Sequence, residues 1–370
     1  MKHTAAGNWD PVLCTTLMLL LGLGLVMITS SSLHLYPTAP WEPMQRHSFA
    51  LGLGLLLATL AYQVPIRWWD KGSIWLYGIG LGLLGLIWLP DLGHEVNGAR
   101  RWLTLPLFRI QPAELMKLFA VLYLASYLAR RQTEVESSLW GFSKPFLILL
   151  IPCGLMVLQP DFGTVAVLLF LTFTLLFLAG ARYRHFILPG MLTLAALAIL
   201  ILVADYRIDR IIGFLDPWQY ATQAGYQLVQ ALTAFGRGGL LGVGLGNSIQ
   251  KHFHLPEAHT DFMLAVIGEE LGLLGTLAVI SLFSLLLWRT FVIGRAAQIR
   301  HERHAAYLAY GLGLCLGAQA FLNIGVNLGV LPTKGLTLPF LSFGGSSLIV
   351  CLIASGILLR LHRENTVCAS

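Results

Sequence analysis

The sequence LPEAHTDF at residues 255–262 leads straight into FMLAVIGEELGLLGTLAVISLFSLLLW at residues 262–288. The second stretch is long enough to cross a bilayer as a helix, because one span takes about 20 mainly apolar residues. Asp261 directly precedes this run, and Glu269 and Glu270 lie inside it. Ionisable groups in or beside a span usually face a polar cavity and mark function. This corner of the sequence therefore predicts a functional carboxylate.

Composition extends the membrane interpretation to the whole chain. Of its 370 residues, 56% are hydrophobic and 11% are charged, whereas a typical soluble domain has about 25% charged residues. The chain is therefore predicted to be an all-α polytopic membrane protein, with one membrane domain over residues 1–370. The net charge of +6 comes from scattered Lys and Arg residues, which disfavours nucleic acid as a partner.

Runs of apolar residues predict about ten transmembrane helices. They cover residues 12–32, 47–64, 73–90, 113–129, 145–159, 163–180, 186–204, 262–288, 305–328 and 343–361. An even number of spans places both termini on one side, and the connections on that side hold most of the Lys and Arg residues. The positive-inside rule thus predicts cytoplasmic N- and C-termini and a large extracytoplasmic loop, about residues 205–261, between spans seven and eight.

Most cations predicted on the outer side fall in two loops, residues 91–112 and 205–261. Cations placed against the topological preference suggest an anionic partner outside the bilayer, although long loops are less subject to the rule. In the first loop, arginine forks and a tryptophan suit a diphosphate or a lipid headgroup, or else form an ordinary interfacial anchor. The residues of this loop are Arg100, Arg101, Trp102 and Arg109.

Two ionisable residues interrupt the fourth predicted span. Glu114 and Lys117 lie three apart on one helical face, close enough to pair. The pair either lines a polar cavity or fixes the packing of neighbouring helices. Pro112 suits the first turn of this helix, where its missing N–H does no harm. Asp161 is expected to cap the helix that follows it.

Glycines and prolines break the apolar pattern in two further places. The glycine-rich run at residues 236–246 lacks the spacing of a dinucleotide loop and predicts a re-entrant or interfacial bend. Broken helices at membrane depth are tolerated around a cavity or inside protein, and residues 329–347 are predicted to form one. Lys334 in that region joins the candidate anion-binding cations.

Taken together, these motifs resemble the SEDS family of shape, elongation, division and sporulation proteins. The resemblance covers nearly the whole chain. It rests on Asn97–Trp102, Gln111–Glu114 with Lys117, Gln159–Thr164, Gly242–Ser248 followed by Leu255–Phe262, Gly268–Gly272 and Ser342–Ser347. Within the family, the sequence LPTKGLTLP at residues 331–339 is similar to the division branch, since the elongation branch usually lacks the Thr-Lys pair.

The resemblance implies a peptidoglycan glycosyltransferase that polymerises lipid II, with inversion, at the outer face of the bacterial inner membrane. It also implies action at the division septum beside a class B penicillin-binding protein and other division proteins. Asp261 matches the family's essential aspartate and is the expected general base for the acceptor 4-hydroxyl. Cations would stabilise the departing polyprenyl diphosphate. A divalent cation, Mg or Mn, could assist there, although no metal-ligand spacing in the sequence demonstrates one.

The candidate substrate-binding residues are these cations together with polar groups near Asp261 and in the C-terminal motif. They are Arg100, Arg101, Trp102, Arg109, Glu114, Lys117, Arg207, Arg210, Lys251, Glu257, His259, Lys334, Ser342 and Ser346. Glu257 is expected to satisfy backbone or basic partners, and His259 to orient Asp261. Glu269 and Glu270 would lie about 12 to 14 Å deeper along a helix, too far in to touch the acceptor hydroxyl.

Two functions of other classes also fit the sequence. A transporter that flips the lipid-linked precursor would use intramembrane charges and broken helices in the same way. A non-catalytic scaffold of the division machinery would need only the fold. Neither requires a catalytic base, so replacement of Asp261 separates both from the glycosyltransferase.

Overall fold

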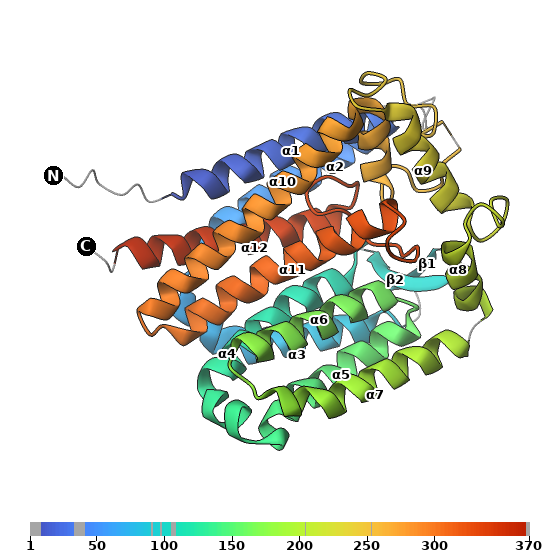
Figure 1. The fold of residues 1–370 in the computed structure, drawn as a ribbon. Coiled ribbons are helices and arrows are strands. Elements are labelled where there is room, and N and C mark those ends of the chain that lie inside the picture. Colours follow the sequence, from blue (N-terminus) through green and yellow to red (C-terminus); the bar gives the residue numbers. More distant parts are fainter. Residues whose placement is uncertain are drawn as a thin grey trace.

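A computed structural model of the chain describes residues 9–32, 41–89, 92–96, 98–104, 109–203, 205–252 and 254–367. Most of these residues are helical (Figure 1). The long helices are α1 (Pro11–Ser32), α2 (Glu42–Gln63), α3 (Ile66–Leu86), α4 (Pro112–Ser137), α5 (Leu139–Leu158), α6 (Phe162–Leu178), α7 (Tyr183–Leu202), α10 (Met263–Ile299), α11 (Arg303–Asn327) and α12 (Gly345–Val367). The shorter elements are α8 (Asp205–Leu215), α9 (Tyr226–Gly238), β1 (Gly93–Val96), β2 (Ala99–Thr104) and β3 (Arg109–Ile110).

Each predicted span corresponds to one of the long helices. Within the described residues, seven helices are long and apolar enough to cross a membrane alone, or up to eight if a bent pair counts as one span. That pair is α2 and α3, which meet at 117°. The bend falls at Val64 and Pro65, because proline cannot donate to a helix and disfavours helical geometry in the residue before it. α6, with 17 residues, is apolar but shorter.

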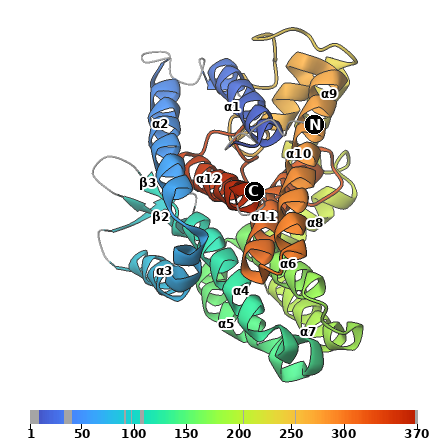
Figure 2. The same ribbon diagram turned by 90° about the vertical axis from the view of Figure 1, so that its left-hand side faces the viewer.

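The centre of the bundle is formed by α4 and α11. In each of these helices 78% of the most apolar window is buried, against 11% in α7, which lies at the periphery. α11 packs against α4, α6 and α10, and α12 packs along α2. Figure 2 shows α12 and α11 near the middle of the bundle. The central helices are where polar side chains can be held away from lipid.

α10 is the longest helix, with 37 residues, and it is broken at Gly272. Gly272 has φ +69°, a conformation that residues with a side chain rarely adopt. The glycine-rich segment 238–244 docks on this break: the amides of Val243 and Gly244 donate to the carbonyls of Glu269 and Glu270 at 3.0 and 3.1 Å. The predicted bend of the glycine-rich run is therefore present, and it satisfies the backbone groups that the broken helix exposes.

The all-α prediction was wrong for the segment before α4. β1, β2 and β3 form a three-stranded antiparallel sheet in that order, with Gly93 paired to Leu103 and Leu103 paired to Ile110. The β1–β2 turn contains Gly98 with φ +75°. An Asn-Gly pair favours a two-residue hairpin turn, so the sequence carried a signal for this element. Asn97 itself lies outside the described residues, as does Phe108.

The helices place the connecting elements at two ends of the bundle. In Figure 1, the start of α1 and the end of α12 lie at one end, and β1, β2, α8 and α9 lie at the other. The segment between α7 and α10 holds the two short helices α8 and α9. The predicted functional loops are thus gathered at the end opposite the chain termini.

Candidate active site around Asp261

Asp261 lies in a tight turn immediately before α10. The amides of Asp261 and Phe262 both donate to the carbonyl of Glu257, at 3.0 and 3.2 Å, and Glu257 has φ +56°. The carbonyl of Asp261 accepts from the side chains of Asn323 and Asn327 on α11, at 2.8 and 3.0 Å. The backbone of Asp261 is therefore fixed by the central helix of the bundle.

The carboxyl group of Asp261 has a pKa close to neutral pH. Burial, reinforced by the negative charge of Glu257, raises the pKa of Asp261 to about 7. Arg101 and Arg210 oppose this increase, since their positive charges favour the ionised form. A carboxylate whose pKa is close to the working pH is suited to accept and return a proton.

Two of the predicted cations, Arg101 and Arg210, act on this carboxylate, and a third, Lys334, lies near Arg210. Arg101 of β2 donates to the carbonyls of Gln159, at 3.0 Å, and Pro160. Arg210 of α8 donates to the carbonyl of Thr333 at 3.4 Å. In the part of the chain that the structure describes, neither guanidinium pairs with a carboxylate.

Lys334 completes this group of cations. Its ammonium has a lowered pKa because of burial and because of the nearby charge of Arg210. Among the described residues it has no acidic partner within salt-bridge distance. Cations without an acidic partner are suited to bind an anion.

Gly335 allows the Lys334 loop to approach Asp261. A Cβ built on Gly335 would lie 3.1 Å from Oδ2 of Asp261, closer than ordinary van der Waals contact. The loop reaches this position because Asn323 donates to the carbonyl of Leu336 at 2.6 Å. α11 thus fixes both the carboxylate and the loop that faces it.

Glu114 and Lys117 pair as their spacing predicted, at 2.9 Å, and both are buried within the bundle. The Lys117 ammonium also donates to Gln319 of α11 at 2.5 Å. Gln319 in turn donates to the carbonyl of Thr337 at 3.0 Å. The pair is therefore connected through α11 to the loop that carries Lys334.

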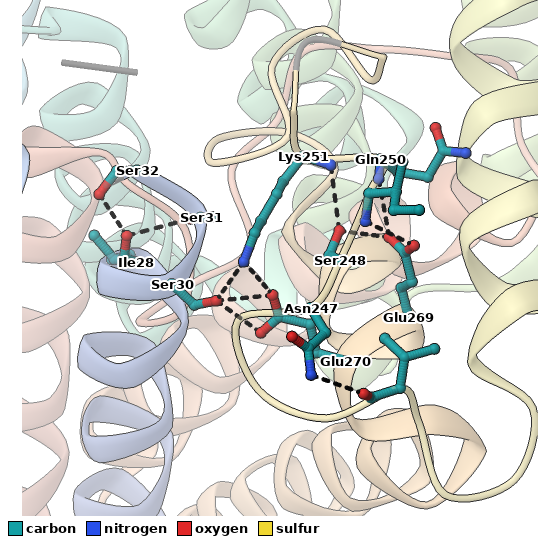
Figure 3. A network of polar contacts seen from close by, with 12 residues as sticks. Ile28, Ser30, Ser31, Ser32, Asn247, Ser248, Gln250, Lys251, Glu269 and Glu270 are labelled. Atoms are coloured by element: carbon teal, nitrogen blue, oxygen red, sulfur yellow. Dashed lines mark hydrogen bonds and ion pairs between the residues drawn. The ribbon is translucent and has the colours of Figure 1, made fainter. Parts of the chain in front are cut away.

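Lys251 was predicted to contact the diphosphate, but the structure places it in a different polar cluster. Its ammonium pairs with Glu270 at 2.6 Å and donates to Ser30 of α1 at 3.0 Å. Lys251 and Glu270 are both almost completely buried, and Figure 3 shows Lys251 reaching toward both partners. Glu270 thus already neutralises the charge of Lys251, and the predicted contact of Lys251 with the diphosphate stays a prediction.

Glu269 is satisfied in the same region. It pairs with Arg237 at 2.5 Å. It also accepts from the Ser248 hydroxyl at 2.5 Å (Figure 3). The amides of Ile249 and Gln250 also donate to it, at 3.0 and 3.3 Å. Glu269 and Glu270 therefore hold the segment 247–251 against the broken helix α10.

The remaining outer cations lie beside the site with other partners. Arg100 pairs with the exposed Glu95 of β1 at 3.3 Å. Arg207 lies 4.0 Å above the ring of Phe162, which ties α8 to α6. Arg109 is exposed and Trp102 is partly buried on the same small sheet.

The polar residues nominated in the C-terminal motif bind backbone. Ser342 accepts from the amide of Leu338 at 2.9 Å. Ser346 accepts from the amide of Gln111 at 3.0 Å and donates to the carbonyl of Arg109 at 3.1 Å. Their hydroxyls thus join the C-terminal loop and the sheet to the bundle.

The expected roles of Glu257 and His259 need correction. Glu257 accepts from the Thr260 hydroxyl at 2.6 Å and pairs with no cation among the described residues. No hydrogen bond joins the ring of His259 to Asp261 within the described ranges; the ring instead lies 5.8 Å from that of Phe343. Asn323 and Asn327 hold Asp261, as given above.

The positioning amides were not identified from the sequence. Gln319, Asn323 and Asn327 recur at every fourth residue along α11, so they share one helical face. That face carries the contacts to Lys117, to the Lys334 loop and to Asp261. Polar residues at this spacing in an apolar helix were the available signal.

A metal site is not defined by the described residues: they contain no group of three or more His, Cys, Asp or Glu side chains placed to hold an ion. The predicted divalent cation stays a prediction.

A family model described as "Cell cycle protein", covering FtsW, RodA and SpoVE, matches residues 11–367. The chain belongs to this family of cell cycle proteins.

Curated relatives of this cell cycle protein carry the name "Probable peptidoglycan glycosyltransferase FtsW". The protein from Coxiella burnetii is 47% identical over 98% of both chains. That from Nitrosococcus halophilus is 50% identical over 93% of this chain and 90% of the relative. These similarities confirm the predicted family and its division branch.

Solved structures support the fold of this cell cycle protein. A structure described as "Structural coordination of polymerization and crosslinking by a peptidoglycan synthase complex" aligns over 98% of this chain and 99% of the other, with a TM-score of 0.80 and 34% identity. The rod shape determining protein RodA of Thermus thermophilus aligns over the same shares, with a TM-score of 0.71 and 33% identity.

Proposed function

We propose that the protein is a peptidoglycan glycosyltransferase of septal cell-wall synthesis, which polymerises lipid II into glycan strands. The observation that carries the proposal is the carboxyl group of Asp261, whose pKa is about 7 and which is influenced by the positive charges of Arg101 and Arg210. Lys334 lies near Arg210 and directly precedes Gly335, which approaches Asp261. The names of the curated relatives, which match nearly the whole chain, support the same activity.

In the proposed reaction, Asp261 acts as general base. Its carboxylate accepts the proton of the acceptor 4-hydroxyl as the oxygen attacks the anomeric carbon of the donor. The bond from that carbon to the diphosphate oxygen breaks, and the electron pair leaves with the polyprenyl diphosphate. Attack opposite the leaving group inverts the configuration. General-base assistance of this kind contributes about 10²- to 10⁴-fold.

The leaving diphosphate gains negative charge in the transition state. Arg101, Arg210 and Lys334 would meet this charge. The first two act on Asp261, Lys334 lies near Arg210, and none of the three has an acidic partner within the described residues. Cations already held in place stabilise a developing charge without reorganisation.

Orientation and partners complete the proposal. Positively charged connections near the chain termini favour a cytoplasmic location for that end, so the Asp261 end faces outward from the inner membrane.

The solved peptidoglycan synthase complex has a related chain, which supports a class B penicillin-binding protein as partner at the septum, together with other divisome proteins. α10, whose apolar helix crosses the bundle, connects the two ends.

The test uses the full chain, purified with its partner enzyme and supplied with lipid II. Asp261→Asn removes the base and keeps the shape of the side chain, and we expect polymerisation to fall by about 10²- to 10⁴-fold. Asp216→Asn, an exposed aspartate of the same outer segment, is the matched control and should keep activity.

Three results would contradict the proposal. Polymerisation that persists in the Asp261→Asn protein would remove Asp261 from the chemistry. Absence of polymerisation in the unsubstituted complex, with transfer of lipid II across vesicle membranes, would favour the transporter. Normal division of Asp261→Asn cells with the protein present would favour the scaffold.

A further inference from the structure

An open cavity of about 450 Å³ lies next to the candidate active site. Its walls come from α8, from the start of α9, from the loop that carries Asp261 and from Thr333. The volume is within the range of about 300 to 1,000 Å³ that is typical of ligand sites. The chemistry proposed above uses only Arg210 among its lining residues.

The cavity presents unused hydrogen-bonding groups. Its lining includes Asp209, Gln223, Tyr226 and Gln227. Within the described residues, the side chains of these four make no hydrogen bond or ion pair. Two amides, a carboxylate and a phenol offer both donors and acceptors, so the cavity suits a ligand rich in hydroxyl and amide groups.

The charge of the cavity argues against a phosphate as its occupant. Asp209 and Arg210 are its two charged lining residues, and their charges offset one another. A phosphate would meet the carboxylate of Asp209, whereas sugar hydroxyls can donate to it. The ring of Tyr206 adds an apolar surface at the cavity wall, and aromatic surfaces combined with a few polar groups are typical of small-molecule sites.

The position of the cavity connects it to Asp261. Arg210 lines the cavity, and its charge also lowers the pKa of Asp261. Pro256 lines it from the same loop that leads into Asp261, and Thr333 directly precedes Lys334. A chain of sugars held in the cavity would therefore end beside the general base and the anion-binding cations.

We propose that this cavity is a saccharide subsite, which binds N-acetylhexosamine units through Gln223, Tyr226, Gln227 and Asp209. The proposal rests on the glycosyltransferase function given above. The saccharide comes either from the lipid-linked precursor or from the growing glycan strand. In both cases the subsite positions sugar relative to Asp261 and takes no part in proton transfer.

The test compares the Gln223→Ala/Gln227→Ala protein with the unsubstituted chain, each in complex with its partner enzyme. Initial rates are measured against lipid II concentration, and a lipid-free tetrasaccharide of alternating N-acetylhexosamines is added as an inhibitor. Loss of two hydrogen bonds predicts a KM or inhibition constant about five- to fiftyfold higher, with kcat within about twofold. Gln230→Ala, on the same helix but outside the cavity lining, is the matched control.

The KM for lipid II and the inhibition constant of the tetrasaccharide together distinguish the source of the saccharide. An increase in KM for lipid II alone assigns the subsite to the precursor, and weaker inhibition by the tetrasaccharide assigns it to the strand. If neither the KM nor the inhibition constant changes, the proposed subsite is contradicted. Thermal unfolding checks that the variant is folded; if it is not, Gln227→Glu and Tyr226→Phe replace it in the same assay.

The experiment separates this proposal from the proposed function. If the unsubstituted complex does not polymerise lipid II, the function fails. Calorimetric titration of the isolated protein with the tetrasaccharide then decides the subsite: binding that Gln223→Ala/Gln227→Ala abolishes supports it, and absence of binding overturns it.

Discussion

At the scale of single residues, the charges around Asp261 determine the pH range in which it can act as a base. Because the pKa of Asp261 is raised to about 7, activity should rise with pH through neutrality as the carboxylate ionises. Glu257→Gln removes a charge that raises this pKa, so the acidic limb of the pH–rate profile should move to lower pH. Arg101→Gln removes a charge that lowers it, so the limb should move to higher pH.

The measurement is kcat/KM for lipid II polymerisation between about pH 5 and pH 9. Arg46→Gln, which breaks an exposed ion pair on α2, is the control and should leave the limb in place. Shifts of Glu257→Gln and Arg101→Gln in the same direction would contradict the electrostatic account.

A second residue-scale prediction concerns the approach of Gly335 to Asp261. Gly335→Ala puts a methyl group 3.1 Å from Oδ2 of Asp261, so the carboxylate must shift by a few tenths of an ångström. We expect kcat to fall about tenfold, since small displacements of reacting groups are costly, with little change in thermal stability.

The matched control for this substitution is Gly236→Ala in α9, where an added Cβ meets no atom within 4 Å. It should leave kcat unchanged. Equal losses of activity and of stability in Gly335→Ala would indicate a packing defect in place of a displaced carboxylate.

At the scale of elements, the Lys251–Glu270 pair ties α1 and the segment 247–251 to the broken helix α10. Lys251→Met leaves the buried carboxylate of Glu270 without a cation, which should destabilise the fold by about 3 to 5 kcal/mol. Lys251→Met/Glu270→Gln removes both charges and should recover most of that loss. Thermal unfolding of the detergent-solubilised protein measures both.

The exposed Arg46–Glu42 pair supplies the comparison, because surface pairs contribute little. Arg46→Met should therefore leave the unfolding temperature almost unchanged. A double variant less stable than Lys251→Met alone would contradict the ion-pair explanation.

Elements also show where sequence reasoning succeeded and where it stopped. The apolar runs predicted every long helix, and the i, i+3 spacing predicted the Glu114–Lys117 pair, because both depend on local periodicity. Asp261 was singled out because it precedes the apolar run of α10, and its catalytic role stays a prediction. The pairing of Lys251 with Glu270 was not predicted, because the two residues lie 19 apart along the chain and meet only in the tertiary structure.

At the scale of the whole molecule, the start of α1 and the end of α12 lie at one end of the bundle, and β1, β2, α8 and α9 lie at the other (Figure 1). With cytoplasmic termini, a cysteine at Thr222 should react with a membrane-impermeant maleimide in intact cells. A cysteine at Ser137, the exposed last residue of α4, should react only after permeabilisation. The unsubstituted chain measures the background labelling of the native cysteines. Labelling in the reverse order would invert the proposed topology.

The docking of the glycine-rich segment on the break in α10 restricts where residues can be inserted or deleted. Gly239, Val243 and Gly244 exchange backbone hydrogen bonds with residues 269, 270 and 273, so one inserted or deleted codon in either stretch would shift every contact out of register. Homologues should therefore keep a constant spacing from Gly238 to Gly272.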